Sequence, residues 1–192
     1  MADTYLQIPD WRIRGVSRNV SSAAALEWTS KGVEMVKGDI DDVESLKRAF
    51  ADADVIFGVT DFWTIFQDPK SQEKKRPGQE IVQYCYDVEL LQAKNLADAA
   101  ASIHGLNRFI FSSMADATKW SKGKFQQLYH MNSKAQGVYY MQSLPGLKGK
   151  FSQVQAPIYF QLPILWGLPT TPKKVSSTLS VLRSRMLAPR VY

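Results

Sequence analysis

Trp11-Arg-Ile-Arg-Gly-Val-Ser-Arg-Asn19 alternates polar and apolar side chains in its central part, a pattern that predicts a β-strand. A short helix over 23–29 is expected to follow it. Gly32-Val-Glu-Met-Val-Lys-Gly-Asp-Ile-Asp-Asp42 then supplies a second short strand, and Asp41 or Asp42 can cap the next helix. Strands that alternate with helices in this way are typical of an α/β protein with a parallel sheet.

The same pattern continues through the middle of the chain. Val55-Ile-Phe-Gly-Val-Thr60 is apolar throughout and predicts a strand that is buried on both faces. Residues 61–78 are polar and contain prolines and a glycine, so we expect a loop that leaves the carboxyl end of this strand, where α/β proteins usually bind their ligands. Four further elements are predicted: a helix over 80–103, a strand over 108–113, a helix over 126–142 and a strand over 151–155. On the helix over 80–103, the positions expected to face the core are Ile81, Tyr84, Val88, Leu91 and Leu96.

Length and composition indicate one ordinary globular domain, because the 192 residues are 45% apolar and 22% charged. The sequence has no charged-then-apolar leader and no apolar run close to the roughly 18 residues of a membrane span. We therefore expect a cytoplasmic protein, with the nucleus as the alternative, and no membrane partner. Cys85 is the only cysteine and there are two histidines, so we expect neither a disulfide nor a metal site.

Charge is divided unevenly along the chain. Residues 1–116 contain 13 Lys and Arg against 18 Asp and Glu, whereas residues 117–192 contain 11 Lys and Arg and no acidic residue. Such an asymmetry can indicate attraction to nucleic acid. Because the basic residues are scattered and match no recognition motif, we do not expect nucleic-acid binding. They are expected to surround a phosphate-binding cleft or to lie on a solvated face.

Six short motifs occur in order along the chain, and together they are more specific than any one of them. They are Arg14-Gly-Val-Ser-Arg-Asn19, Lys37-Gly-Asp-Ile-Asp-Asp42, Val59-Thr-Asp-Phe-Trp63, Phe109-Ile-Phe-Ser-Ser113, His130-x3-Lys134 and Leu144-Pro-Gly-Leu147. On these motifs, about residues 5–165 resemble the NmrA-like family. These proteins are atypical short-chain dehydrogenases, known from fungi as nitrogen-metabolite regulators and as oxidoreductases of secondary metabolism. The resemblance implies a partial, doubly wound parallel sheet of Rossmann type over 1–168, followed by a divergent basic tail over 169–192.

The resemblance also implies that the chain is truncated at both ends. The family begins with a strand and a Gly-x-x-Gly-x-x-Gly turn, whose main-chain N–H groups hold the cofactor pyrophosphate. Here only ten residues precede Trp11 and none is glycine, and Asp3-Thr-Tyr-Leu-Gln7 resembles the last turn of the helix that follows the glycine turn. We therefore expect the first strand and the pyrophosphate cradle to be missing. The family's substrate-covering domain, beyond about residue 170, is expected to be absent as well.

Five residues resemble those that contact the cofactor in the family. Arg18 resembles the arginine that meets the adenosine 2′-phosphate, which favours NADP over NAD, although it could also be a solvated loop arginine. Asp39 and Ile40 resemble the pair beside the adenine, with helix capping as the alternative role for Asp39. Thr60 and Phe62 stand where the family lines the ribose and nicotinamide, but an apolar strand end would have the same sequence.

Lys134 and His130 resemble the catalytic part of the family. Classical short-chain dehydrogenases place Tyr and Lys at i and i+4 of one helix, where the lysine binds the nicotinamide ribose and lowers the tyrosine pKa. Here Lys134 is retained, whereas the position of the tyrosine is taken by His130, which could still exchange a proton near neutral pH. A structural or ribose-contacting role for His130 is the alternative. Ser112 and Ser113 could offer hydroxyl groups to a ligand or cap a turn.

Three functions are therefore open. The first is an NADP-dependent oxidoreductase of fungal secondary metabolism, in which Lys134 positions the nicotinamide ribose next to a small organic substrate. The second is a non-catalytic regulator or protein-interaction module that senses NADP, or that binds no cofactor. The third is a fragment whose sheet lacks a central strand, and which closes the gap, pairs with another copy as a homo-oligomer, or aggregates.

Overall fold

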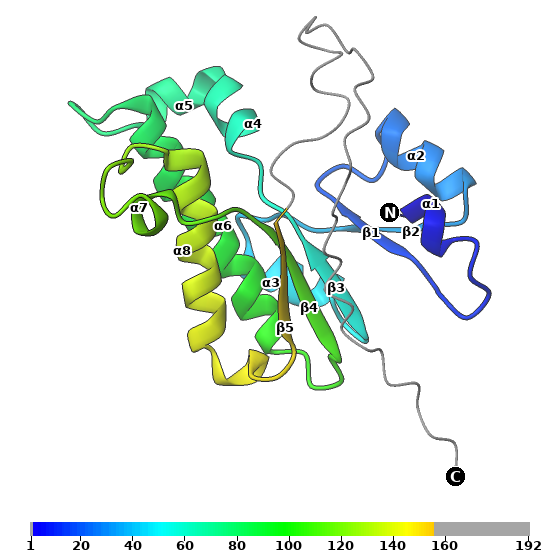
Figure 1. Ribbon diagram of the computed structural model, residues 1–192. Helices are drawn as coiled ribbons and strands as arrows, with labels where there is room; N and C mark the ends of the chain where they lie inside the picture. The colour runs from blue at the N-terminus through cyan, green and yellow to red at the C-terminus, as the bar shows by residue number, and fades with distance from the viewer. Residues whose placement is uncertain (1, 156–192) are drawn as a thin grey trace, which may run out of the picture. The chain divides into compact units, whose positions relative to one another are not determined.

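The computed structural model describes residues 2–155 (Figure 1). The predicted tail over 169–192 and the last part of the predicted Rossmann-like domain lie outside the described residues. The elements are α1 (Ala2–Tyr5), β1 (Arg14–Ser17), α2 (Ala23–Ser30), β2 (Glu34–Lys37), α3 (Val43–Ala49), β3 (Val55–Gly58), α4 (Phe62–Gln67), α5 (Pro69–Lys74), α6 (Ile81–Ala101), β4 (Arg108–Ser113), α7 (Ala117–Trp120), α8 (Tyr129–Ser143), the 3-10 helix η1 (Pro145–Leu147) and β5 (Phe151–Gln155).

All strand pairs among the described residues are parallel, which confirms the predicted α/β class. β1 pairs with β2 in a two-stranded sheet, and β3, β4 and β5 pair in that order in a second sheet. Within residues 2–155 no pairing joins β1 to β3. The two sheets are instead separated by a cavity of about 1730 Å³, which residues of both β1 and β3 line.

Capping side chains fix the helices that follow β1 and β2. The Ser22 hydroxyl accepts a hydrogen bond from the N–H of Ala25 at the start of α2. Asp42, rather than Asp41, is the N-cap of α3, and its carboxylate accepts from the N–H groups of Glu44 and Ser45 at 3.0 and 3.2 Å. The chain can therefore return to the sheet after a short helix each time.

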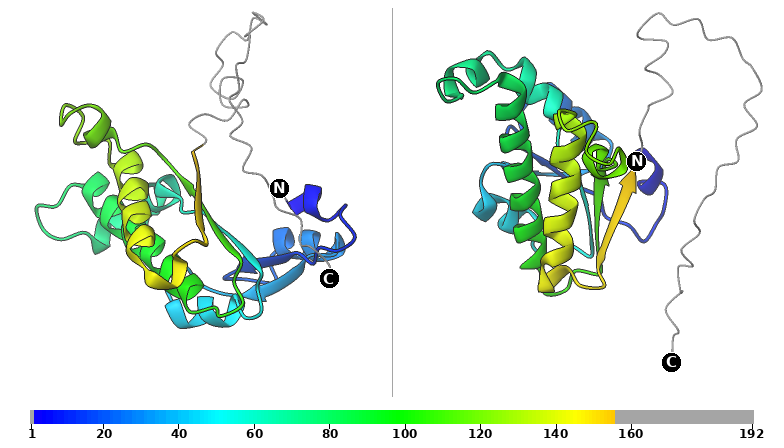
Figure 2. Two further views of the ribbon diagram at one scale, coloured as in Figure 1. Left: turned by 60° about the horizontal axis from the view of Figure 1, so that its bottom comes forward. Right: turned by 60° about the vertical axis from the view of Figure 1, so that its left-hand side comes forward.

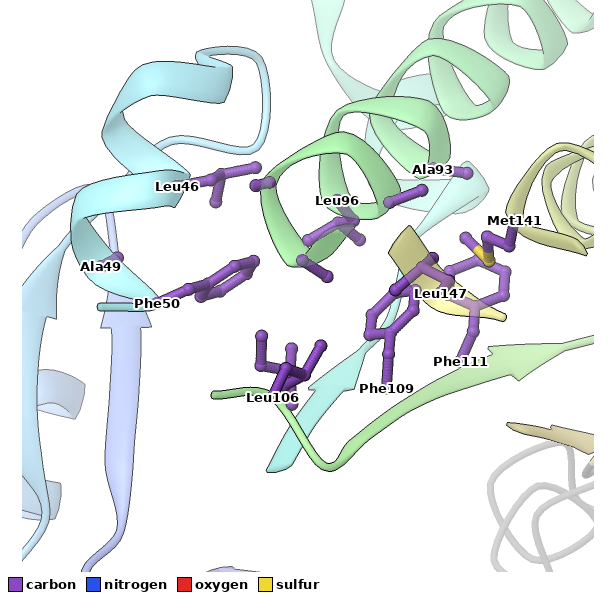
Figure 3. Close-up of a cluster of buried hydrophobic side chains, with 14 of the residues drawn as sticks. Leu46, Ala49, Phe50, Ala93, Leu96, Leu106, Phe109, Phe111, Met141 and Leu147 are labelled. Carbon is purple, nitrogen blue, oxygen red and sulfur yellow. The ribbon is translucent and has the colours of Figure 1, made fainter. Parts of the chain in front are cut away.

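The core lies between the three-stranded sheet and the helices that cover one of its faces (Figures 1 and 2). α6 and α8 lie side by side on this face, and Gly137 permits the close approach, because a Cβ there would stand only 2.8 Å from the Cβ of Ala93. Figure 3 shows the buried cluster, which includes Leu46 of α3, Phe50 just after α3, Leu96 of α6, Phe109 and Phe111 of β4, Met141 of α8 and Leu147 of η1.

The buried face of α6 differs from the predicted one. Leu91 was expected in the core, but 56% of its surface is exposed, and of the five predicted positions only Leu96 is buried. α8 packs against a neighbouring face of small side chains, which allows the two helices to approach more closely than a leucine-rich face would. The buried residues of α6 include Cys85, Ala93, Ala97, Ala99 and Ala100, which are small, as well as Glu89 and Leu96.

Two expectations around β3 are wrong. Residues 61–78 are not a plain loop but contain α4 and α5, because Asp61 caps the first and Asp68 caps the second, in which Pro69 occupies the first turn. β3 is not buried on both faces either. Phe57 is 41% exposed and Val59, just after the strand, is 53% exposed, because α6 and α8 cover only the opposite face of this sheet.

Candidate functional site

Three of the predicted cofactor-binding residues line the cavity that separates the two sheets. Arg18 follows β1, Ile40 follows β2 and Thr60 follows β3, so each stands just beyond the carboxyl end of a parallel strand. Arg18 is exposed, Ile40 is partly buried and Thr60 is 4% exposed. Within the described residues, no hydrogen bond or ion pair engages the Arg18 guanidinium. This arrangement brings a cationic residue and a threonine to the lining of one space.

Asp39 is not among the residues that line this cavity. Its carboxylate accepts a hydrogen bond from the Asp41 N–H at 3.1 Å and so stabilises the turn after β2, while Asp42 caps the helix. The neighbouring Asp41 does line the cavity, and its carboxylate accepts from the Gln92 side chain at 3.0 Å. The turn after β2 therefore brings Asp41, and not the predicted Asp39, to the cavity lining.

Lys134 lies behind Thr60 rather than in the cavity lining. Its side chain is only 12% exposed, and it reaches from α8 to the end of β3. The Lys134 ammonium donates to the Thr60 carbonyl oxygen, and to Thr60 Oγ1 at 2.8 Å. It also forms an ion pair with Glu89 Oε1 at 2.8 Å. The helix of the predicted catalytic pair is thus tied to the strand end that lines the cavity.

Glu89 is the residue of this site that the sequence prediction missed. It comes from α6, is completely buried, and accepts a hydrogen bond from Thr60 Oγ1 at 2.9 Å on Oε1 and one from the Ser133 hydroxyl on Oε2. A buried carboxylate is tolerated only when it is paired and hydrogen-bonded, and both conditions are met here. A signal was present, because Glu89 falls at helical spacing between Cys85 and Ala93 on the buried face of α6.

His130 lies one helical turn before Lys134 on α8, as predicted, but it faces aromatic side chains. Its ring centroid is 6.0 Å from that of Phe62 and 5.4 Å from that of Trp63. Burial lowers the pKa of His130 below its ordinary value of 6.5, although the charge of Glu89 opposes this shift. A neutral imidazole at neutral pH can accept a proton. Neither His130 nor Phe62, which is 3% exposed, lines the cavity.

Ser113, a further candidate for ligand binding, has a structural partner. Ser113 is buried and donates to Gln153 Oε1 at 2.7 Å, so its hydroxyl joins β4 to β5. Residues 2–155 contain no group of His, Cys, Asp and Glu that could hold a metal ion. Among the helices of the same residues, none combines the length and the apolar character that crossing a membrane requires.

Comparison with known proteins agrees with the motifs. The model of the NmrA-like family matches residues 2–162. Among solved structures, NmrA, a negative transcriptional regulator, is 20% identical with a TM-score of 0.59, over 82% of this chain and 41% of that one. Triphenylmethane reductase of Citrobacter sp., complexed with NADP(H), is 19% identical with a TM-score of 0.56, over 83% of this chain and 46% of that one.

A further structure of NmrA, in complex with NADP, is 19% identical with a TM-score of 0.52, over 75% of this chain and 36% of that one. The chain therefore spans less than half the length of these structures. At such identities the structural matches establish the Rossmann-like fold, and the family model establishes the family. The family predicted from the six motifs is confirmed: the chain belongs to the NmrA-like family.

Proposed function

We propose that this chain binds NADP(H) at the carboxyl ends of β1, β2 and β3 and acts as an NAD(P)-dependent oxidoreductase. The observation that carries the proposal is that Arg18 and Thr60, from strands of different sheets, line one cavity. Ligands of open parallel α/β sheets bind outside the carboxyl ends of the strands. The proposal is also supported by structures of this fold in complex with NADP(H), as in triphenylmethane reductase, and with NADP, as in NmrA.

The residues present suit the adenosine part of such a ligand. Arg18 carries a fixed charge and planar donors that match a phosphate, and Ile40 offers an apolar contact for a ring. Thr60 offers its hydroxyl, supported by Lys134, to a ribose. Asp39 and Phe62 remain proposed cofactor-binding residues. Asp39 stabilises the turn after β2, and Phe62 packs against His130.

His130 and Lys134 remain the proposed catalytic residues. A bound nicotinamide supplies the hydride chemistry. The task of the protein is then to orient the substrate and to hold a proton beside it. His130 suits this task because its depressed pKa keeps the imidazole neutral, and therefore able to accept a proton, at neutral pH. The substrate is proposed to be a small organic molecule, within fungal secondary metabolism.

We also propose that the first strand and the glycine turn of the Rossmann unit are missing between β1 and β3. Support comes from the cavity between these strands and from the absence of any strand that joins them within residues 2–155. Main-chain N–H groups at a helix N-terminus usually anchor the pyrophosphate. Their loss would weaken NADP(H) binding on the order of a thousandfold.

A substitution at Arg18 tests the proposed ligand. We expect Arg18→Ala to weaken NADPH binding about tenfold and to leave the weaker binding of NADH unchanged, because only NADPH carries the 2′-phosphate. Titration calorimetry measures both affinities. Arg12→Ala is the matched control, since Arg12 lines the same cavity before β1 begins. Equal losses for both nucleotides, or an equal loss in the control variant, would contradict the proposal.

A non-catalytic regulator that senses NADP is the second candidate. It is favoured by the position of His130, which stands where a tyrosine acid is usual and packs against Phe62 and Trp63. The similarity in fold to NmrA, a negative transcriptional regulator, points in the same direction. Absorbance of NADPH in the presence of a panel of carbonyl compounds distinguishes the candidates. Binding without oxidation, together with retention of a protein partner by Lys134→Ala, supports the regulator.

A further inference from the structure

The Lys134 ammonium has little capacity left for a ligand. An ammonium group has three N–H donors. Three oxygen atoms already surround Nζ, namely the carbonyl and hydroxyl oxygens of Thr60 and Glu89 Oε1. Because these groups belong to the protein and the side chain is only 12% exposed, Lys134 can contact a ligand only by giving up one of them.

The Thr60 hydroxyl, in contrast, has one position free. A hydroxyl has one donor and two acceptor positions. Thr60 Oγ1 donates to Glu89 Oε1 at 2.9 Å and accepts from Lys134 at 2.8 Å, so one acceptor position remains. Thr60 also lines the cavity, whereas Glu89 and Lys134 do not. At the end of β3 the Thr60 hydroxyl can therefore meet a ligand only as a hydrogen-bond acceptor, because its proton is donated to Glu89.

We propose that Glu89 is a positioning residue, which makes Thr60 an acceptor for a hydroxyl group of the bound ligand. The Glu89 carboxylate accepts the hydrogen bond of the Thr60 hydroxyl. It also holds the Lys134 ammonium beside the Thr60 hydroxyl oxygen. The ligand group selected at this point is a hydroxyl donor, as in a ribose, and not an ether or carbonyl oxygen. This inference rests on the proposed NADP(H) site and assigns its specificity at the end of β3.

The charge of Glu89 is essential to this arrangement. Its two oxygens face one cation and two hydroxyl donors, from Lys134, Thr60 and Ser133, and a carboxylate is acceptor-only when ionised. A glutamine would turn an NH₂ group toward one of these donors and leave the Lys134 charge unpaired. In Glu89→Gln one of these donors would therefore lose its acceptor, and the Lys134 ammonium would lose its charged partner.

Ligand titrations test the role of Thr60. We expect Thr60→Val to weaken NADPH binding about tenfold and Thr60→Ser to bind nearly as the wild type does, because serine keeps the hydroxyl. The control is Thr64→Val, because Thr64 lines the same cavity but its hydroxyl is bonded to Asp61. Wild-type affinity in Thr60→Val, or an equal loss in Thr64→Val, would overturn the inference.

A measurement without ligand tests the role of Glu89 separately. In ¹⁵N-lysine NMR spectra we expect a slowly exchanging ammonium signal from Lys134, which is absent from Glu89→Gln and retained in Glu73→Gln, because Glu73 is an exposed residue of α5. If Glu89→Gln does not fold, Thr60→Val must shift and weaken the same signal. A signal that neither variant alters overturns the positioning role. Failure of the wild type to bind NADPH would instead refute the proposed function, while the ammonium signal would still decide the role of Glu89.

Discussion

His130 couples the stability of the protein to pH at the scale of a single side chain. Burial against Phe62 and Trp63 lowers its pKa below 6.5, so the folded state resists protonation that the unfolded state accepts. The unfolded chain therefore binds more protons as the pH falls through 6.5 toward the folded pKa. The contribution of His130 to stability is complete above 6.5 and is lost below it.

This sign can be checked by urea unfolding at about pH 7.5 and about pH 5.5, on either side of the ordinary histidine pKa. We expect the free energy of unfolding of the wild type to fall more over this interval than that of His130→Gln. His104→Gln is the natural control, because His104 is exposed and is the only other histidine. The same pH dependence in the wild type and in His130→Gln would disprove the assignment.

Part of the cavity lining could be predicted from the sequence, and the rest of the candidate site could not, for a physical reason. Arg18, Ile40 and Thr60 follow strands, so their common edge is a consequence of parallel topology that motifs can reveal. Glu89 was missed because a glutamate in a helix is usually solvated. Its burial depends on the partner Lys134, 45 positions away in the sequence, and no local pattern contains that contact.

At the scale of elements, the packing of α6 against α8 depends on small side chains. We expect Gly137→Val to lower the free energy of unfolding by about 1–3 kcal/mol, because even a Cβ at this position would stand 2.8 Å from Ala93. Chemical denaturation measures the change. Gly105→Val is the matched control, since a Cβ at Gly105 would meet no atom within 4 Å. A similar loss in both variants would show that the contact between the helices is not the cause.

α4 depends on the capping residue that precedes it. Asp61 is its N-cap, and its carboxylate accepts from the N–H groups of Trp63 and Thr64. Partial burial raises the pKa of Asp61, but these hydrogen bonds and one from the Thr64 hydroxyl outweigh it, so that the pKa is lowered overall. The stabilisation is therefore present above the ordinary pKa of 3.8 and is lost as the pH falls through the folded value.

Replacement of this cap tests its contribution. Asp61→Ala is expected to destabilise α4 by about 1 kcal/mol, whereas Asp61→Asn keeps an acceptor and costs less. Hydrogen exchange of the amides in α4 is the direct measurement, because local opening precedes global unfolding. Unchanged protection in Asp61→Ala would exclude the cap as the reason why this segment is helical.

The strength of the local sequence signal explains which elements could be predicted. β4 and β5 match the predicted bounds, because the apolar run of β4 and the turn before β5 are both strong local signals. α4 and α5 were missed because Pro69 and the polar composition around it suggested a loop, although proline is tolerated in the first turn of a helix. The exposure of Leu91 was missed because several faces of α6 carry apolar side chains, and only packing selects among them.

At the scale of the whole molecule, residues 2–155 expose apolar side chains next to strands that are not joined to each other. Val16 is 39% exposed on β1, and Phe57 is 41% exposed on β3. Unpaired strand edges beside apolar side chains promote association with other chains. We expect the protein to self-associate as its concentration rises, which sedimentation velocity would show.

A lysine on the exposed face of β3 should reduce this association. We expect Phe57→Lys to shift the protein toward the monomer, while Leu26→Lys leaves the distribution unchanged. Leu26 is the appropriate control because it is 57% exposed but lies on the helix α2 and not on a strand. If both variants behave as the wild type, or if the wild type is a monomer at all concentrations, the strand edges do not drive association.

Because the two sheets are separate, a bound nucleotide would also protect the protein from proteolysis. Besides the chain itself, Arg14 ties β1 to the end of α3, through bonds to the carbonyl oxygens of Ala49 and Ala51 at 3.1 and 2.7 Å. A ligand that touched Arg18 on one side of the cavity and Thr60 on the other would add a link between the two sheets. Cells depleted of that ligand would then hold more of the opened, protease-sensitive form, so that abundance itself would report nucleotide supply.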